Sequence, residues 1–334
     1  MSTTGIGDLA QSFQLRRDNA RLQETFRTLA DELSSGRRSD LGRTVAGDFG
    51  PLPGIERGLK AVAAYETSAT EAGLMADAAQ SALGFVRDRA GTIAPALLLS
   101  EEDYQPTIVD AAGATAARGF EDAVNALNTR VGDRSVFAGT ATDSPALADP
   151  ETMLIELETL IAGETTAAGV EAAVGAWFAP GGDFETTGYL GGAAPLSGIP
   201  VSEGARVALD VTAADPGVRD VLAGLALGAL LDRGLFAGIL EERAGVARAS
   251  GDRLLSADYA ITGTRARVGM AEERIETAKS RNAAEAQSLE LARASILETD
   301  PFETASRMRE VEVQLETLYA VTARMSRLNL TAFL

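Results

Sequence analysis

The stretch RMREVEVQLETLYAVTARMSRLNLTAFL, residues 307–334, places apolar residues at the spacing of one helix face. A series at intervals of three, four, three and seven residues forms a strip, which Val321 and Leu328 widen: Met308, Val311, Leu315, Leu318 and Met325. Phe333 and Leu334 carry the apolar character to the last residue. Chain ends are normally polar and frayed unless something ties them down. This face must therefore be covered, either by the rest of the chain or by another molecule.

A matching strip lies near the start of the sequence. Leu22, Phe26, Leu29 and Leu33 recur at spacings of four, three and four residues, and Leu15 stands one heptad before Leu22. The two ends of the sequence thus carry helices of the same amphipathic kind.

These two strips, called the terminal strips below, admit two interpretations. In the first, both strips pack in the monomer's own core. In the second, neighbouring subunits complete that core, which would also order the terminal helices only on assembly. The second interpretation makes the strips a candidate subunit interface, consisting of Leu15, Leu22, Phe26, Leu29, Leu33, Met308, Val311, Leu315, Leu318, Val321, Met325, Leu328, Phe333 and Leu334.

The composition argues against most catalytic chemistry. The 334 residues include no Cys and no His, which removes thiol nucleophiles, Cys/His zinc sites and His-based acid–base catalysis. Acidic clusters at 101–103, 241–242 and 272–273 lack the spacing of a calcium loop and are typical of solvated helix faces. We therefore expect no enzyme, no cofactor and no metal site, although carboxylate, Ser/Lys or Tyr chemistry stays open in principle.

The net charge of −18 argues against nucleic acid as a partner, because an anionic surface repels a phosphate backbone. The longest apolar run, 221–231, is far shorter than the ~20 residues needed to span a bilayer, so we expect no membrane insertion. The first fifteen residues contain no Lys or Arg and no apolar segment. They therefore do not predict a cleavable secretory signal.

Three zones can be separated along the chain. Residues 1–135 are helical, 136–233 form a small α+β insertion, and 234–334 are helical again. The sequence thus predicts a mostly α fold, an elongated helical rod formed by the N- and C-terminal helices with an inserted α+β middle domain.

The boundaries of the long helices follow from Gly and Pro. Residues 34–54 read as an irregular link, helices are expected at 55–94 and 101–131, and another runs from the 230s to Ile296. Four glycines are expected to interrupt or weaken the helix that runs from the 230s to Ile296: Gly245, Gly251, Gly263 and Gly269. Asp-Pro steps mark three further helix starts: Asp149-Pro150 and Asp300-Pro301, each with Asp as N-cap and Pro at the first helical position, and Asp215-Pro216.

The middle zone reads as mixed structure. SVFAG at 135–139 predicts a short strand, and the chain from Asp183 predicts strands separated by turns. Val207, Leu209 and Val211 alternate with polar or small residues, as in a half-buried strand. Other positions are assigned to ordinary packing, namely Gly224 and Gly228 to a close helix contact, Trp177 to a partly buried position, and Met153, Leu157, Leu160 and Ile161 to one helix face.

Several segments resemble the flagellin superfamily of bacterial flagella. Leu-Ser-Ser-Gly at 33–36 is similar to the signature that ends that family's first helix. TGTRARVGMAEERIETA (262–278), centred on Arg267-Val268-Gly269, resembles the segment that opens its long C-terminal helix, and LETDPFETASRM (297–308) resembles the break before its last helix. RSVFAGT (134–140) is similar to the exit from the N-terminal helices in the hook-associated protein 3 subfamily, with Ala138 in place of Ser. The family's usual segment after Leu-Ser-Ser-Gly has no counterpart at 39–54.

The resemblance implies helical inner domains built from the termini and an outer domain built from the insertion. It further implies export through the flagellar type III apparatus, with an export chaperone, to the extracellular flagellum. There, a ring of subunits would join hook-associated protein 1 to the flagellin filament as a mechanical adaptor. Two alternatives stay open: a filament flagellin, and a self-contained helical scaffold or adhesin without a flagellar role.

Overall fold

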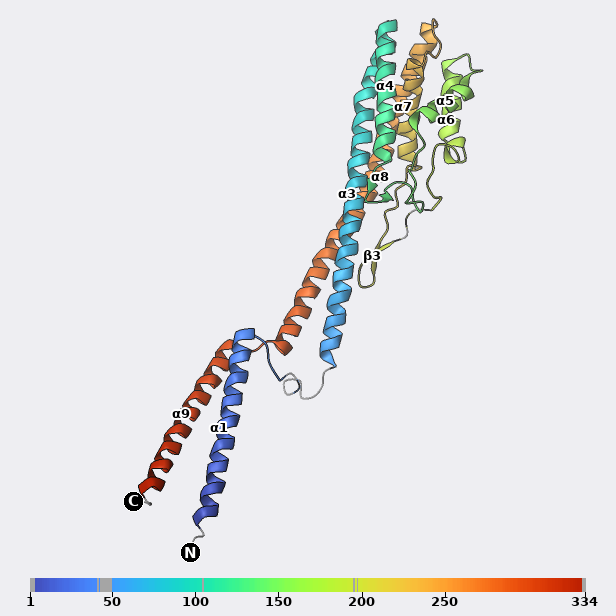
Figure 1. Cartoon of the computed structure of the whole chain (residues 1–334). Helices are drawn as coiled ribbons and strands as arrows, with labels where there is room; N and C mark the ends of the chain where they lie inside the picture. Colours follow the sequence, from blue (N-terminus) through green and yellow to red (C-terminus); the bar gives the residue numbers. More distant parts are fainter. Residues whose placement is uncertain are drawn as a thin grey trace. The chain divides into compact units, whose positions relative to one another are not determined.

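The computed structural model describes residues 4–40, 42, 50–103, 105–194, 196 and 198–331, with side chains described except at 4–9, 100–103 and 326–331. The described chain is mostly α-helical, as predicted, with two small two-stranded sheets (Figure 1). It divides into two compact units: a terminal unit, Met1–Ala61 with Glu285–Leu334, and a central unit, Val62–Ala284. Two helices contribute to both units: α3 (Pro51–Asp103) and α8 (Leu240–Leu297).

The terminal unit is built around α1 (Thr4–Ser35) and α9 (Pro301–Thr331). These helices pack antiparallel, since Gln23 near the middle of α1 bonds Tyr319 while Gln11, nearer its start, meets Met325. An isolated antiparallel β-bridge links the segment after α1 to the segment before α9. In it the Arg38 amide donates to the Leu297 carbonyl (2.9 Å) and the Thr299 amide to the Gly36 carbonyl (3.0 Å).

Local sequence signals determine where α1 ends and where α9 begins on either side of this bridge. Gly36 directly follows α1 and has a φ of 68°, the left-handed conformation that ends many helices. Glycine adopts this conformation without strain because it has no Cβ. The Asp300 carboxylate accepts from the amides of Phe302 (2.8 Å) and Glu303 (3.2 Å), and Arg307 bonds Glu303 at 2.6 Å. The predicted start of the last helix is therefore confirmed, whereas the first helix continues two residues beyond its predicted end, to Ser35.

The core of the central unit is formed by four helices: α3, α4 (Pro106–Leu127), α7 (Pro216–Asp232) and α8. All but a few side chains of α7 are buried. A Cβ added at Gly228 would lie 2.5 Å from the Ala116 Cβ, and one at Gly224 would lie 2.7 Å from Leu254. The predicted close helix contact at these glycines is confirmed, and it sets how near α7 lies to α4 and α8.

In the central unit, α3 and α8 also run antiparallel. The Gln80 side chain and Arg265 bond each other reciprocally: the Arg265 Nε donates to the Gln80 Oε1 (2.8 Å), and the Gln80 amide donates to the Arg265 carbonyl (3.2 Å). Further along, Arg87 pairs with Asp258 at 2.7 Å. Progress along α3 thus corresponds to decreasing residue numbers on α8.

Smaller elements cover this helical core (Figure 1). Trp177, Phe178 and Phe184 form an aromatic cluster with ring centroids 4.7–5.6 Å apart. Trp177 is only 4% exposed, so its assignment to the core is confirmed. The elements are β1 (Arg130–Val131), β2 (Arg134–Ser135), α5 (Pro150–Ile161), α6 (Ala167–Phe178), η1 (Asp183–Glu185), β3 (Ile199–Ser202) and β4 (Ala205–Val207).

Some expectations for the helices were wrong. α3 begins earlier than predicted and continues through Pro95 to Asp103, and α4 ends at Leu127. α8 begins at Leu240 and is continuous through its glycines. Gly251 explains why: a Cβ there would lie 2.7 Å from Leu98, so this glycine admits a neighbouring helix and does not break its own.

The middle zone contains fewer strands than predicted. Within SVFAG only Ser135, the last residue of β2, is in a strand, and the rest forms bends and a turn, with Gly139 at a φ of 56°. The chain at Asp183 is a short 3-10 helix, and the predicted strand through Val211 pairs only as far as Val207. On α5, Leu160 is 43% exposed, and Leu154 takes the buried place beside Leu157.

Asp-Pro steps start α5 and α7 as predicted. The Asp149 carboxylate caps α5 by accepting from the Glu151 amide at 2.9 Å. The three predicted zones are consecutive stretches of the sequence. The two compact units combine segments that are distant in sequence, so they do not test the zone boundaries. None of the helices within the described ranges combines the length and hydrophobicity needed to cross a membrane.

Candidate subunit interface

The terminal strips lie on α1 and α9, which pack against each other within the terminal unit. Leu29 and Val311 are the best covered, each 9% exposed, and Leu33 and Val321 are exposed. Leu328, Phe333 and Leu334 lie outside the described side chains. The remaining strip residues are half-buried: Leu15, Leu22, Phe26, Met308, Leu315, Leu318 and Met325.

This burial is incomplete when compared with the central unit. There, Leu83, Phe120 and Leu222 are 0% exposed, whereas no described apolar side chain of α1 or α9 is less exposed than 9%. The physical reason is geometric, because an amphipathic helix carries an apolar stripe at least ~100° wide and one partner helix covers only part of it. The structure therefore brings the two strips together but leaves each of them partly uncovered.

A groove of about 600 Å³ opens between the two helices. Across it, the Gln23 side-chain amide donates to the Tyr319 hydroxyl at 3.0 Å. The strip residues Leu15, Leu318 and Met325 lie in its wall. The other lining residues are Ser12, Arg16, Asn19, Ala20, Gln23, Tyr319 and Thr322.

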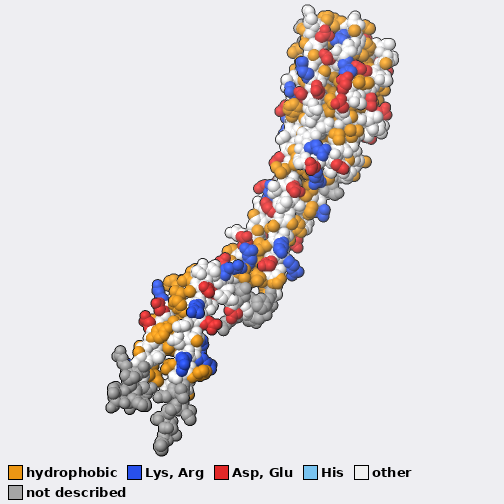
Figure 2. Space-filling model, viewed as in Figure 1, with side chains coloured by type: hydrophobic (Ala, Val, Ile, Leu, Met, Phe, Trp, Pro, Cys, Tyr) orange, Lys and Arg blue, Asp and Glu red, His pale blue; other side chains and the backbone are white. Residues whose placement is uncertain are grey.

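Apolar side chains outside the predicted strips are also exposed in this unit. Phe302 is 86% exposed, Phe13 68%, Val313 59% and Tyr319 50%. Hydrophobic surface is visible along the terminal unit in the space-filling view (Figure 2). The strip periodicity does not include these four residues, and the sequence carries no other signal that would have identified them.

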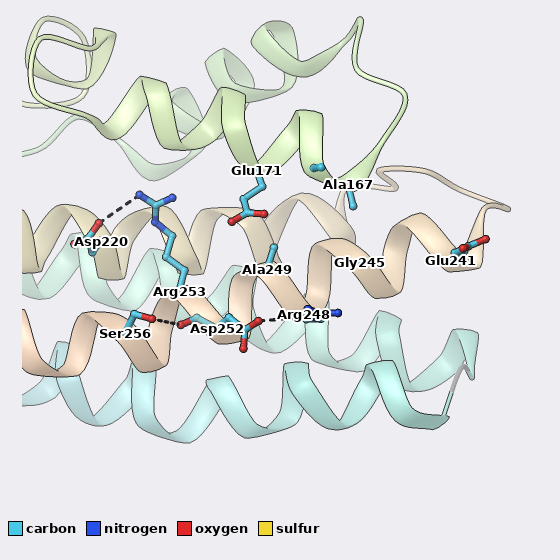
Figure 3. A pocket seen from close by; sticks show the side chains of 11 residues that line it. Ala167, Glu171, Asp220, Glu241, Gly245, Arg248, Ala249, Asp252, Arg253 and Ser256 are labelled. Carbon is cyan, nitrogen blue, oxygen red and sulfur yellow. Dashed lines mark hydrogen bonds and ion pairs between the residues drawn. The ribbon is translucent and has the colours of Figure 1, made fainter.

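A second candidate site is a charged hollow of about 730 Å³ between α6, α7 and α8 in the central unit (Figure 3). Its two arginines are each paired with a carboxylate of the same hollow, Arg253 with Asp220 at 3.3 Å and Arg248 with Asp252 at 3.6 Å. Its lining includes no Lys, Tyr, Cys or His. Because both of its arginines are already paired with carboxylates, this hollow is a weaker candidate than the terminal groove.

No cluster of three metal-ligating side chains occurs within the part of the chain that the structure describes. The clearest electrostatic network is structural: Arg233 at the end of α7 bonds both carboxylate oxygens of Glu151 at 2.9 Å and also contacts Glu158. These hydrogen bonds from Arg233 lower the pKa of the Glu151 carboxyl below its usual value.

The structure thus pairs two terminal helices, α1 and α9, whose packing against each other covers their apolar strips only in part. Residues 255–334 match the bacterial flagellin C-terminal helical region. The C-terminal helical region of this chain is thus similar to that of bacterial flagellin, in agreement with the predicted resemblance. The match spans α9 and α8 from Leu255 onward, including the Arg267-Val268-Gly269 segment, and it supports a flagellar structural role.

Among solved structures, one from Vibrio parahaemolyticus, provisionally described as a flagellar hook-associated protein, is similar over 71% of this chain and 95% of its own. The two share 12% sequence identity with a TM-score of 0.41, which is too low to support a functional inference. No curated protein matches the sequence.

Proposed function

We propose that this chain is a structural subunit of the hook–filament junction of the bacterial flagellum. In this role a ring of subunits joins hook-associated protein 1 to the flagellin filament and transmits load between them. The match of residues 255–334 supports the flagellar part of the proposal. The observation that carries the assembly mechanism is the incomplete burial of the terminal strips on α1 and α9.

Burial energetics favour completion of these strips by neighbours. Fully burying a large apolar side chain contributes ~1.5–3 kcal/mol of favourable free energy. Each half-buried strip residue could therefore contribute roughly half of that amount when a neighbouring subunit covers the rest of it. Association costs about 4–15 kcal/mol in lost freedom, which no single strip residue can offset. Several residues on both helices must therefore be covered together, which favours a cooperative assembly of many subunits.

The same proposal assigns the remaining partners and the location. The subunit is exported through the flagellar type III apparatus, assisted by an export chaperone, and acts in the extracellular flagellum. No catalytic role is proposed, because the sequence provides neither Cys nor His and the charged hollow between α6, α7 and α8 neutralises its own arginines.

Filament flagellin is a second candidate, because the matched region is described for flagellin itself. The two roles differ in abundance. A filament subunit should be the major protein of sheared flagella, whereas a junction subunit should be a trace component confined to one end. Quantitative mass spectrometry of sheared flagella distinguishes them.

A charge placed in a terminal strip tests the assembly mechanism. Leu318→Asp buries a carboxylate in the groove, whereas Gln314→Asp places the same charge at an exposed position of α9. We expect Leu318→Asp to leave the central unit folded and to abolish incorporation into flagella, and Gln314→Asp to assemble normally. Normal motility of the Leu318→Asp strain would contradict the proposal.

A further inference from the structure

The three Asp-Pro steps of the chain start their helices with the same two residues but not with the same side-chain contact. The Asp149 carboxylate accepts a hydrogen bond from the Glu151 amide (2.9 Å), and the Asp300 carboxylate accepts from the Phe302 amide (2.8 Å). The Asp215 carboxylate makes no such bond to the first turn of α7. Asp215 is therefore the exception among three otherwise equal helix starts.

The main chain of Asp215 does not explain this difference. Its φ and ψ are −62° and 144°, and those of Asp149, which caps α5, are −58° and 135°. Both residues thus have the non-helical conformation that is typical of an N-cap. The backbone of Asp215 suits a cap, and only the direction of its side chain differs.

Two partners hold the Asp215 carboxylate away from α7. Arg267 of α8 forms an ion pair with it, and the Thr212 hydroxyl donates to its Oδ1 at 3.4 Å. The Asp215 amide in turn donates to the Thr212 carbonyl at 3.2 Å. The ion pair therefore ties the turn 212–215, which leads into α7, to the side of α8.

This arrangement leaves an amide at the start of α7 without an acceptor. Pro216 has no amide, so the first amide of the helix is that of Gly217. Within the described part of the chain no hydrogen bond reaches it, whereas the next amide, that of Val218, donates to the Asp215 carbonyl at 3.0 Å. Gly217 is buried, and a Cβ added there would lie 2.6 Å from the Ala260 backbone. A buried amide without an acceptor is unfavourable, and a capping Asp215 would satisfy it.

Burial also acts against the present position of the carboxylate. The Asp215 side chain is 16% exposed, and burial raises the pKa of its carboxyl above the usual value, although Arg267 and Thr212 act to lower it. The Arg267 side chain is 46% exposed, so salt and water weaken the ion pair. The contact that holds Asp215 is therefore a weak one, and another donor, the Gly217 amide, lies two residues further along the chain.

We propose that Asp215 is a latch with two positions. In the first, which the structure shows, it pairs with Arg267 and ties the turn 212–215 to α8, while the Gly217 amide is uncapped. In the second, the carboxylate leaves Arg267 and caps α7 through the Gly217 amide, which releases the turn from α8. The latch couples the attachment of the segment 208–215 to the order of the first turn of α7. It involves neither terminal strip and does not depend on the proposed flagellar role.

Removal of the Arg267 guanidinium should open the latch. In Arg267→Gln the amides of 208–215 are expected to exchange faster, and the Gly217 amide about fivefold slower than in the parent, the scale of one N-cap contact. Hydrogen exchange of the full chain, resolved to single residues by fragmentation mass spectrometry, measures both changes in one experiment. Faster exchange at Gly217, or no change there, would overturn the proposal.

Two further arginine variants serve as controls for this measurement. Arg267→Lys retains the positive charge and is expected to restore the parent rates at 208–215 and at Gly217. Arg274→Gln removes an exposed arginine two turns further along α8 and is expected to change neither region. The same changes in Arg274→Gln as in Arg267→Gln would overturn the proposal, because they would assign the effect to the charge of the helix.

Two alanine variants separate the latch from an ordinary cap. Asp149→Ala removes an existing cap, so the Glu151 amide is expected to exchange about fivefold faster. Asp215→Ala removes no cap, so the Gly217 amide is expected to keep the parent rate while 208–215 exchanges faster. A loss of protection at Gly217 comparable with that at Glu151 would overturn the proposal, because it would show that Asp215 already caps α7.

Discussion

Gln23 of α1 donates a hydrogen bond to the hydroxyl of Tyr319 on α9 at 3.0 Å, across 296 positions of sequence. The two ends of the chain therefore meet within one compact unit. Tyr319 is half exposed, and the groove beside it is lined by strip residues from both helices. The polar contact holds two helices together while part of each apolar strip stays uncovered, which is the geometry that the proposed assembly requires.

Val311 is expected to stabilise the pairing of α1 with α9. Val311 is 9% exposed, so Val311→Ala should remove buried contacts and weaken the pair by about 1–3 kcal/mol. Val313, on the same helix, is 59% exposed, and Val313→Ala should change the stability of the α1–α9 pair by less than about 0.5 kcal/mol. Amide hydrogen exchange of α1 in the monomer measures the difference, and equal effects of the two variants would refute the assigned packing.

Two glycines of the central unit should respond to alanine in opposite directions. Gly228→Ala places a Cβ 2.5 Å from the Ala116 Cβ and should destabilise the unit by about 1–3 kcal/mol through overpacking. Gly263 in α8 has no atom within 4 Å of an added Cβ, so Gly263→Ala should stabilise the helix by about 0.5–1 kcal/mol. Thermal unfolding of both variants gives the signs, and a stable Gly228→Ala protein would contradict the observed closeness of α7 and α4.

The ion pair between Glu151 and Arg233 should make stability depend on acid. The pKa of the Glu151 carboxyl is lowered from 4.5 by its hydrogen bonds to Arg233. A depressed pKa means that the folded state favours the ionised form, so the contribution is complete above pH 4.5 and is lost as pH falls through the lower folded value. Glu151→Gln should therefore be less stable than the parent at neutral pH, and the two should converge in acid.

Denaturant unfolding of both proteins over a pH series provides the measurement. Glu156→Gln on the same helix is the control for removing a carboxylate that Arg233 does not bind. A stability difference between parent and Glu151→Gln that does not change with pH would show that the ionised pair contributes nothing.

Local signals in the sequence predicted the capped starts of α5 and α9, because the chemistry of a cap lies within three or four residues, but they misplaced ends of α3, α4 and α8. Asp300 and Asp149 accept the amides that an N-cap should accept, and Gly36 ends α1 in the left-handed conformation. Non-local pairing could not be predicted in this way. Leu209 and Val211 show the expected alternation of burial, but whether a strand finds a partner depends on segments distant in sequence.

The same distinction explains the outcome for glycines and for the candidate interface. Gly251 breaks no helix, since the approach of Leu98 uses the space that its missing side chain leaves. Periodicity located the strip residues, such as Leu22 and Leu315, but it could not show that α1 and α9 would cover each other only in part. That result depends on how many helices surround each strip, which is a property of the fold.

Amide hydrogen exchange of the full chain, compared between monomer and assembled flagella, tests the central claim most directly. Protection factors in α1 and α9 would be compared with those of the buried helix α7. The account predicts that α1 and α9 exchange far faster than α7 in the monomer and become protected on assembly. Terminal helices as protected as α7 in the monomer, with no change on assembly, would show that the chain covers its own strips and would contradict the claim.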